Sequence, residues 1–116
     1  MGRNERRDND RIPILGELVG GVMVFQPMTV TELGVGGMQI EMPAPLHLDA
    51  LLDFRLLLDD KPVVLKGRVA HCRISDVDTN QVLYRAGIEF VEPPDHAREA
   101  IERYMKKTRA ARTEQV

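Results

Sequence analysis

Three arginines near the N-terminus are the residues of this sequence best suited to bind an anion. Arg7 and Arg11 are four residues apart in the run RRDNDRIPI, and Arg6 directly precedes them. A guanidinium presents a planar fork of donors that matches an anion such as phosphate. Such a run is also typical of a solvated tail. The residues alone therefore leave two interpretations open, a charged tail and a pair of arginines placed for a ligand.

A glycine-rich run, GVGG at residues 34–37, is the second feature with possible chemistry. It is not a P-loop, because no Lys-Ser/Thr pair and no helical pattern follow it. We interpret it as a turn between two strands in which glycine permits a positive φ. Glu32 lies two residues before this run. From the residues alone, it is interpreted as an exposed acid at the end of a strand.

Residues suited to catalysis or metal binding are scattered along the chain. His71 and Cys72 are adjacent in a predicted strand, so their side chains point to opposite faces and cannot share one metal ion. A lone cysteine in a strand is most often a small buried hydrophobe. The sequence has no nucleophile elbow and no HExxH motif. We therefore expect no catalytic residues, no metal site and no enzymatic activity.

The elements that must position these residues are mostly short strands. Apolar and polar residues alternate in several segments, which is the pattern of strands with one buried face. Polar turns containing Gly or Pro separate these segments. The pattern predicts six strands, over residues 17–26, 28–33, 37–42, 50–58, 62–75 and 82–91. Short, closely spaced strands favour an antiparallel sandwich or a small barrel.

After Pro93 and Pro94 the pattern changes to that of a helix. Apolar residues recur at helical spacing at Ala97, Ala100, Ile101, Tyr104 and Met105. The chain is therefore divided into a flexible Arg-rich tail over residues 1–11, a β-barrel over 12–92, a helix over 93–110 and a frayed tail over 111–116. The basic residues of the helix, Arg103, Lys106 and Lys107, are interpreted as a solvated face.

Composition is that of an ordinary folded domain. The 116 residues suggest one domain, with 43% apolar residues, 29% charged residues and a net charge of −2. There is no apolar run long enough to span a membrane, and the single cysteine cannot form an internal disulfide. We therefore expect a cytoplasmic protein without a membrane partner. Nucleic-acid binding would favour a basic chain, so no nucleic-acid partner is expected either.

Taken together, the arginine pair and the glycine run resemble the PilZ domain, a family of cyclic di-GMP receptors. The family pattern is R-x-x-x-R, followed by D/N-x-S-x-x-G. Both motifs lie at the rim of a six-stranded barrel, and a helix comes after the barrel in the sequence. Arg7 to Arg11 match the first motif, and Glu32 to Gly37, beginning 21 residues after Arg11, fall on the second. The run YRAGIEFVEPP at 84–94 is similar to the closing strand of the family. The resemblance covers residues 6–105.

This resemblance implies an all-β fold with a C-terminal helix, built as a six-stranded antiparallel PilZ-like barrel. It implies a bacterial second-messenger receptor that binds cyclic di-GMP, needs no cofactor and relays the signal to an effector protein. The ligand-binding residues that it implies are Arg6, Arg7, Arg11, Glu32, Gly34, Gly36 and Gly37.

The second motif departs from the family pattern at two positions. Glu32 replaces Asp or Asn and moves the carboxylate by one C–C bond, about 1.5 Å. Gly34 replaces Ser and removes a hydrogen bond worth roughly 0.5–1.5 kcal/mol. We therefore expect weakened binding, which Glu32→Asp together with Gly34→Ser should restore. The alternative is a PilZ-like protein-interaction module that no longer binds cyclic di-GMP.

Overall fold

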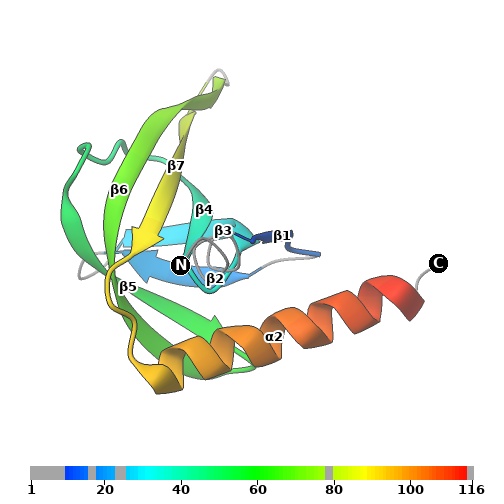
Figure 1. Ribbon diagram of the computed structural model, residues 1–116. Helices are drawn as coiled ribbons and strands as arrows, with labels where there is room; N and C mark the ends of the chain where they lie inside the picture. The colour runs from blue at the N-terminus through cyan, green and yellow to red at the C-terminus, as the bar shows by residue number, and fades with distance from the viewer. Residues whose placement is uncertain (1–9, 16–17, 23–25, 78–79, 115–116) are drawn as a thin grey trace.

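The computed structural model describes residues 10–15, 18–22, 26–77 and 80–114 of the 116-residue chain. These residues form a curled sheet followed by a long C-terminal helix (Figure 1). In chain order, the elements are β1 (Ile12–Pro13), β2 (Val19–Val22), β3 (Gln26–Leu33), β4 (Gly37–Met42), β5 (Leu51–Leu58), β6 (Lys61–Val77), β7 (Val82–Phe90) and α2 (Asp95–Glu114).

Neighbouring strands all pair antiparallel, in the order β2, β5, β6, β7, β4. Strand β3 pairs with both β2 and β4, and the two-residue β1 adds to the end of β3. The sheet therefore curls around one core, although β2 contributes only four residues and the word barrel applies loosely. The prediction of six antiparallel strands and a C-terminal helix is confirmed, with β1 as an addition.

Alternation along each strand decides which side chains enter the core. In β5, Phe54 and Leu56 are fully buried, whereas the residues between and beside them are exposed or half-buried. Burying one such side chain contributes about 1.5–3 kcal/mol, so a one-residue slip in register would be strongly unfavourable. The helix α2 covers one side of the core with Ala97, Ile101 and Met105, all buried and four residues apart (Figure 1).

A tight hairpin between β5 and β6 anchors the middle of α2. Asp59 and Asp60 both have positive φ, 52° and 66°, which is the backbone of a two-residue type I′ turn. This turn presents the Asp59 carboxylate to Lys107, with 3.2 Å between Oδ1 and Nζ. Burial, and next the Asp59 charge, raise the pKa of the Tyr104 phenol above its ordinary value. One side of α2 therefore faces this hairpin.

The bounds of α2 differ from those expected. The helix starts at Asp95. The carbonyl of the preceding residue, Pro94, accepts hydrogen bonds from the N–H groups of Ala97 and Arg98. It continues to Glu114, four residues beyond the expected end at residue 110. The alanines at 110 and 111 are strong helix formers and extend it. In the described part of the chain, no helix is long and apolar enough to span a membrane.

Candidate functional site

Strand β1 brings the end of the arginine motif to the glycine turn. It pairs antiparallel with the last residues of β3, so that Ile12 lies opposite Leu33. The residues that precede Ile12, Asp10 and Arg11, consequently lie beside Gly34, which follows Leu33. Two sequence segments that are far apart in the chain thus meet at one edge of the sheet. Arg6 and Arg7 of the first motif lie outside the described residues.

Gly34 is in close contact with the backbone that carries the arginine motif. A Cβ atom built on Gly34 would overlap the carbonyl oxygen of Asp10 and would lie 3.2 Å from Cγ of Arg11. The overlapping atom belongs to the backbone, which cannot move aside as the end of a side chain can. Glycine at this position therefore makes room for the N-terminal segment. The Gly found where the family pattern has Ser therefore removes a hydroxyl group and also makes room for the Asp10 backbone.

Arg11 extends across the turn from Gly34 to Gly37. Its Cγ lies beside Gly34, and its Nη2 lies 3.2 Å from the position that a Cβ of Gly37 would occupy. That Cβ would also overlap the carbonyl oxygen of Ile88 in β7. Within the described ranges, no carboxylate forms an ion pair with Arg11. The guanidinium thus lies over bare backbone with its charge not neutralised by a neighbouring described acid.

The turn between β3 and β4 is fixed by two backbone hydrogen bonds. The N–H of Gly34 donates to the carbonyl of Gly37 at 2.9 Å, and the N–H of Phe90 donates to the carbonyl of Gly36 at 2.9 Å. Val35 points into the core and is 6% exposed. The expected turn is confirmed. The expected positive φ is wrong for Gly34 and Gly37, which are needed for close approach instead.

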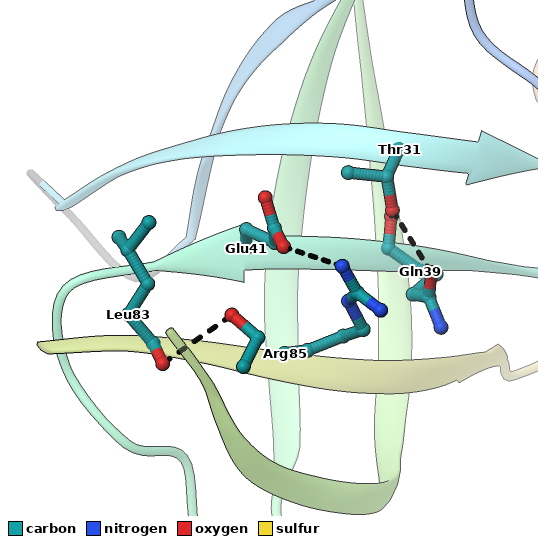
Figure 2. A network of polar contacts seen from close by, with 6 residues as sticks. Thr31, Gln39, Glu41, Leu83 and Arg85 are labelled. Atoms are coloured by element: carbon teal, nitrogen blue, oxygen red, sulfur yellow. Dashed lines mark hydrogen bonds and ion pairs between the residues drawn. The ribbon is translucent and has the colours of Figure 1, made fainter. Parts of the chain in front are cut away.

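Glu32 is half-buried near the end of β3, directly opposite Gln39 of β4. A β-bulge between Val30 and Glu32 shifts the register at this point. The Thr31 hydroxyl donates to Oε1 of Gln39 at 3.1 Å, which orients the amide (Figure 2). Sequence reasoning missed Gln39, because alternation shows only that it faces outward. The cross-strand register is what places it beside Glu32.

The outer face of β4 continues from Gly37 through Gln39 to Glu41, because alternate residues of a strand share a face. Glu41 lies opposite Arg85 of β7 and accepts a hydrogen bond from its Nη2 at 2.8 Å (Figure 2). Both side chains are partly exposed, 25% for Glu41 and 36% for Arg85. The far end of this face therefore carries a charge pair that is neutralised within the sheet.

His71 and Cys72 lie on opposite faces of β6, as expected. His71 is exposed, and its ring lies so close to Gly87 that a Cβ there would overlap Nε2. Cys72 is half-buried and packs against the core. Among the described residues, no group of three or more His, Cys, Asp and Glu side chains is arranged to hold a metal ion.

A groove of about 600 Å³ adjoins the glycine turn on the side of α2. The N-terminal segment and the turn contribute Asp10 and Val35 to its wall. The helix contributes Glu99, Glu102, Arg103, Met105, Lys106 and Arg109. Arg109 Nη2 lies 3.0 Å from Asp10 Oδ2, so the helix contacts the arginine motif directly. The basic helix residues were visible in the sequence, but the direction in which they point was not.

The sequence pattern of the PilZ domain matches residues 3–107, which include both motifs. This chain belongs to the PilZ domain family. No curated protein sequence matches the chain. The recognition of this family from the two motifs is confirmed.

Solved structures share the fold of this PilZ domain. MrkH of K. pneumonia, in its apo state, superposes with a TM-score of 0.80 at 14% identity, over 92% of this chain and 53% of MrkH. This chain therefore spans about half the length of MrkH. The PilZ domain of YcgR from Escherichia coli, solved with c-di-GMP, gives a TM-score of 0.75 at 12% identity, over 91% of this chain and 93% of that domain.

Proposed function

We propose that this PilZ domain is a cyclic di-GMP receptor that relays the second-messenger signal to a partner protein. The observation that carries the proposal is the position of Arg11, which extends from Gly34 to Gly37 with its guanidinium over bare backbone. Membership of the PilZ family supports it, as does the shared fold with the YcgR domain that was solved with c-di-GMP.

The chemistry of the ligand fits the residues of the two motifs. Cyclic di-GMP has two phosphodiester groups and two guanines, and a guanidinium binds either of them through paired hydrogen bonds. Arg6, Arg7 and Arg11 are proposed to clamp the ligand from above. In the turn at residues 34–37 only Val35 has a side chain, and this side chain is buried, so the turn provides a floor that does not hold the ligand away. Glu32 is proposed to accept hydrogen bonds from the Watson–Crick edge of one guanine.

Calorimetric titration with cyclic di-GMP tests this proposal in three proteins. We expect the wild type to bind and Arg11→Ala to bind about 10- to 100-fold more weakly, since a hydrogen bond to a charged group contributes about 1.5–3 kcal/mol. The matched control is Arg68→Ala, which removes an exposed arginine paired with Glu89 at 2.6 Å on β6 and β7. Its affinity should equal that of the wild type. Absence of binding by the wild type would overturn the proposal, and equal binding by all three would overturn the role of Arg11.

The alternative function is that of a protein-interaction module that no longer binds cyclic di-GMP. The departures from the family pattern at Glu32 and Gly34 favour it. The contact of Gly34 with the Asp10 backbone weakens this argument, because it gives Gly34 a structural reason unrelated to loss of the ligand. The calorimetric titration separates the two functions, because a protein-interaction module that no longer binds cyclic di-GMP would give no heat of binding with the wild type.

A further inference from the structure

The groove between α2 and the glycine turn has the dimensions and surfaces of a ligand site. Its volume of about 600 Å³ lies within the usual range for small-molecule sites, about 300–1,000 Å³. Two apolar side chains, Val35 from the turn and Met105 from the helix, are almost fully buried at its base. Charged side chains of α2 form one wall. Such a combination suits a molecule that has both flat apolar parts and negative charge.

Charge along the helical wall is divided between two ends. Glu99 and Glu102 line the end nearer the start of α2, whereas Arg103, Lys106 and Arg109 line the end nearer its C-terminus. The three cations are three residues apart, which keeps them on one side of the helix. They also lie closer to the negative end of the helix dipole, which stabilises positive charge. Among the described residues, the groove is therefore lined by three cations and three acids, and the cations gather at the end where Asp10 of the first motif lies.

Arg103 and Lys106 differ from two other basic residues of α2, Lys107 and Arg109. Arg109 is paired with Asp10, and Lys107, on the side facing the β5–β6 hairpin, is paired with Asp59. In the described part of the chain, no acid forms an ion pair with Arg103 or with Lys106. Their charges are thus directed into a groove that no described acid neutralises by direct pairing.

We propose that Arg103 and Lys106 bind a phosphodiester group of cyclic di-GMP, so that α2 forms one wall of the ligand site. This inference rests on the proposed receptor function and extends it beyond the two sequence motifs. One phosphodiester of the ligand then meets the two cations on the helix, and the other is left for Arg11, which lies over Gly37 and does not line the groove. The helix then contacts the ligand directly, so a partner protein that binds α2 can distinguish the ligand-bound protein from the free protein.

Binding in this groove also affects the contact between the helix and the arginine motif. Asp10 and Arg109 line the groove and are joined to each other at 3.0 Å. A phosphodiester beside Arg103 and Lys106 repels the Asp10 carboxylate and attracts Arg109. The bound ligand is therefore expected to displace Asp10 from Arg109 and to move the N-terminal segment relative to α2.

Two double variants with the same loss of charge test the direct contact. Arg103→Gln/Lys106→Gln removes both cations of the groove, and Arg68→Gln/Lys107→Gln removes two basic residues outside it. Each variant loses two positive charges, and Lys106 and Lys107 are neighbours on one helix, so the change in net charge is the same in both proteins. Calorimetry with cyclic di-GMP gives the affinities, and thermal unfolding verifies that both variants are folded.

We expect the groove variant to bind cyclic di-GMP about 10- to 100-fold more weakly than the wild type, and the control within about threefold. Equal weakening in both variants would overturn the inference in favour of net charge alone. Unchanged affinity in both would remove α2 from the site. In that case, binding by the wild type together with weak binding by Arg11→Ala would leave the receptor function standing. A wild type that does not bind would instead overturn the receptor function and this inference with it.

Discussion

Two arginines lie over the outer face of the same strand, β4, but the residue of β4 that each one meets is different. Arg85 lies opposite Glu41 and is joined to it at 2.8 Å. Arg11 lies over Gly37, four residues earlier, where the strand has no side chain at all. The first arginine is neutralised within the sheet, whereas no described acid pairs with the second, which we propose binds the ligand. The two arginines differ in the residue of β4 beneath each of them, an acid in one case and a glycine in the other.

The same difference separates the basic residues of α2. Lys107 faces the β5–β6 hairpin and is paired with Asp59, whereas Arg103 and Lys106 face a groove in which no described acid pairs with them. Regions that hold the fold together pair their charges internally. At the edge where the two motifs meet, Arg109 pairs with Asp10, but no described acid pairs with Arg11. Substitutions at Gly37 and Gly34 are expected to remove this difference between the arginines, and substitution of Arg85 measures it.

Gly37→Ala should have the largest effect, because it places a side chain beneath Arg11. The added Cβ would overlap the Ile88 carbonyl and lie 3.2 Å from the Arg11 guanidinium. We expect a loss of about 1–3 kcal/mol in the free energy of unfolding, typical of overpacking, together with weaker ligand binding. Urea unfolding and calorimetry measure the two effects. The control is Gln39→Ala, on the same face of β4, which adds no atoms and should leave the fold stable.

If Gly37→Ala were as stable and bound as tightly as the wild type, the close approach would be unimportant. The difference between Arg11 and Arg85 would then have to arise from something other than the bare strand at Gly37.

Gly34→Ser should have an intermediate effect, and in the direction opposite to the one that the family pattern suggests. The pattern alone predicts that a serine hydroxyl restores a ligand contact. The structure instead predicts that its Cβ meets the Asp10 carbonyl and displaces Arg11 from the turn. We expect binding to weaken about tenfold, equivalent to about 1.4 kcal/mol. Glu32→Asp introduces no such overlap and serves as the second variant of the calorimetric comparison.

Tighter binding by Gly34→Ser would show that the N-terminal segment does not lie over Gly34 when the ligand is bound. The motif residues would then act as the family pattern alone predicts, and the structural account of Gly34 would be wrong.

The sequence predicts the sheet better than it predicts the edge where the site lies. Alternation of Met38, Ile40 and Met42 defines β4 with its observed bounds, since burial on one face is a local pattern. Two motifs of a known family indicate that Arg11 and the turn belong together. The hydrogen bond between Arg109 and Asp10 joins residues that are 99 positions apart in the sequence. A local sequence pattern cannot predict a contact between residues so far apart in the chain.

The direction of the helix side chains shows the same limit. Helical spacing predicts that Ile101 and Met105 are buried, and both are. It also predicts that Arg103, Lys106 and Lys107 are on the surface. Whether a surface residue meets an acid, as Lys107 does, or a groove, as Lys106 does, depends on where the β5–β6 hairpin and the N-terminal segment lie. That information is in the tertiary packing and not in the helix.

Arg85→Met should have the smallest effect and is the counterpart of the Arg11 variants. An exposed or partly exposed ion pair contributes about 0–1 kcal/mol, and the Glu41 carboxylate keeps some contact with water when the pair is broken. Among the described residues, the buried Nε of Arg85 also has no hydrogen-bond acceptor, so its removal eliminates one unfavourable group. We expect a change of at most about 1 kcal/mol in the free energy of unfolding and no change in the affinity for cyclic di-GMP. A loss of affinity close to that of Arg11→Ala, measured by the same titration, would place Glu41 and Arg85 inside the ligand site. The distinction between an arginine neutralised by the sheet and one available to the ligand would then no longer hold.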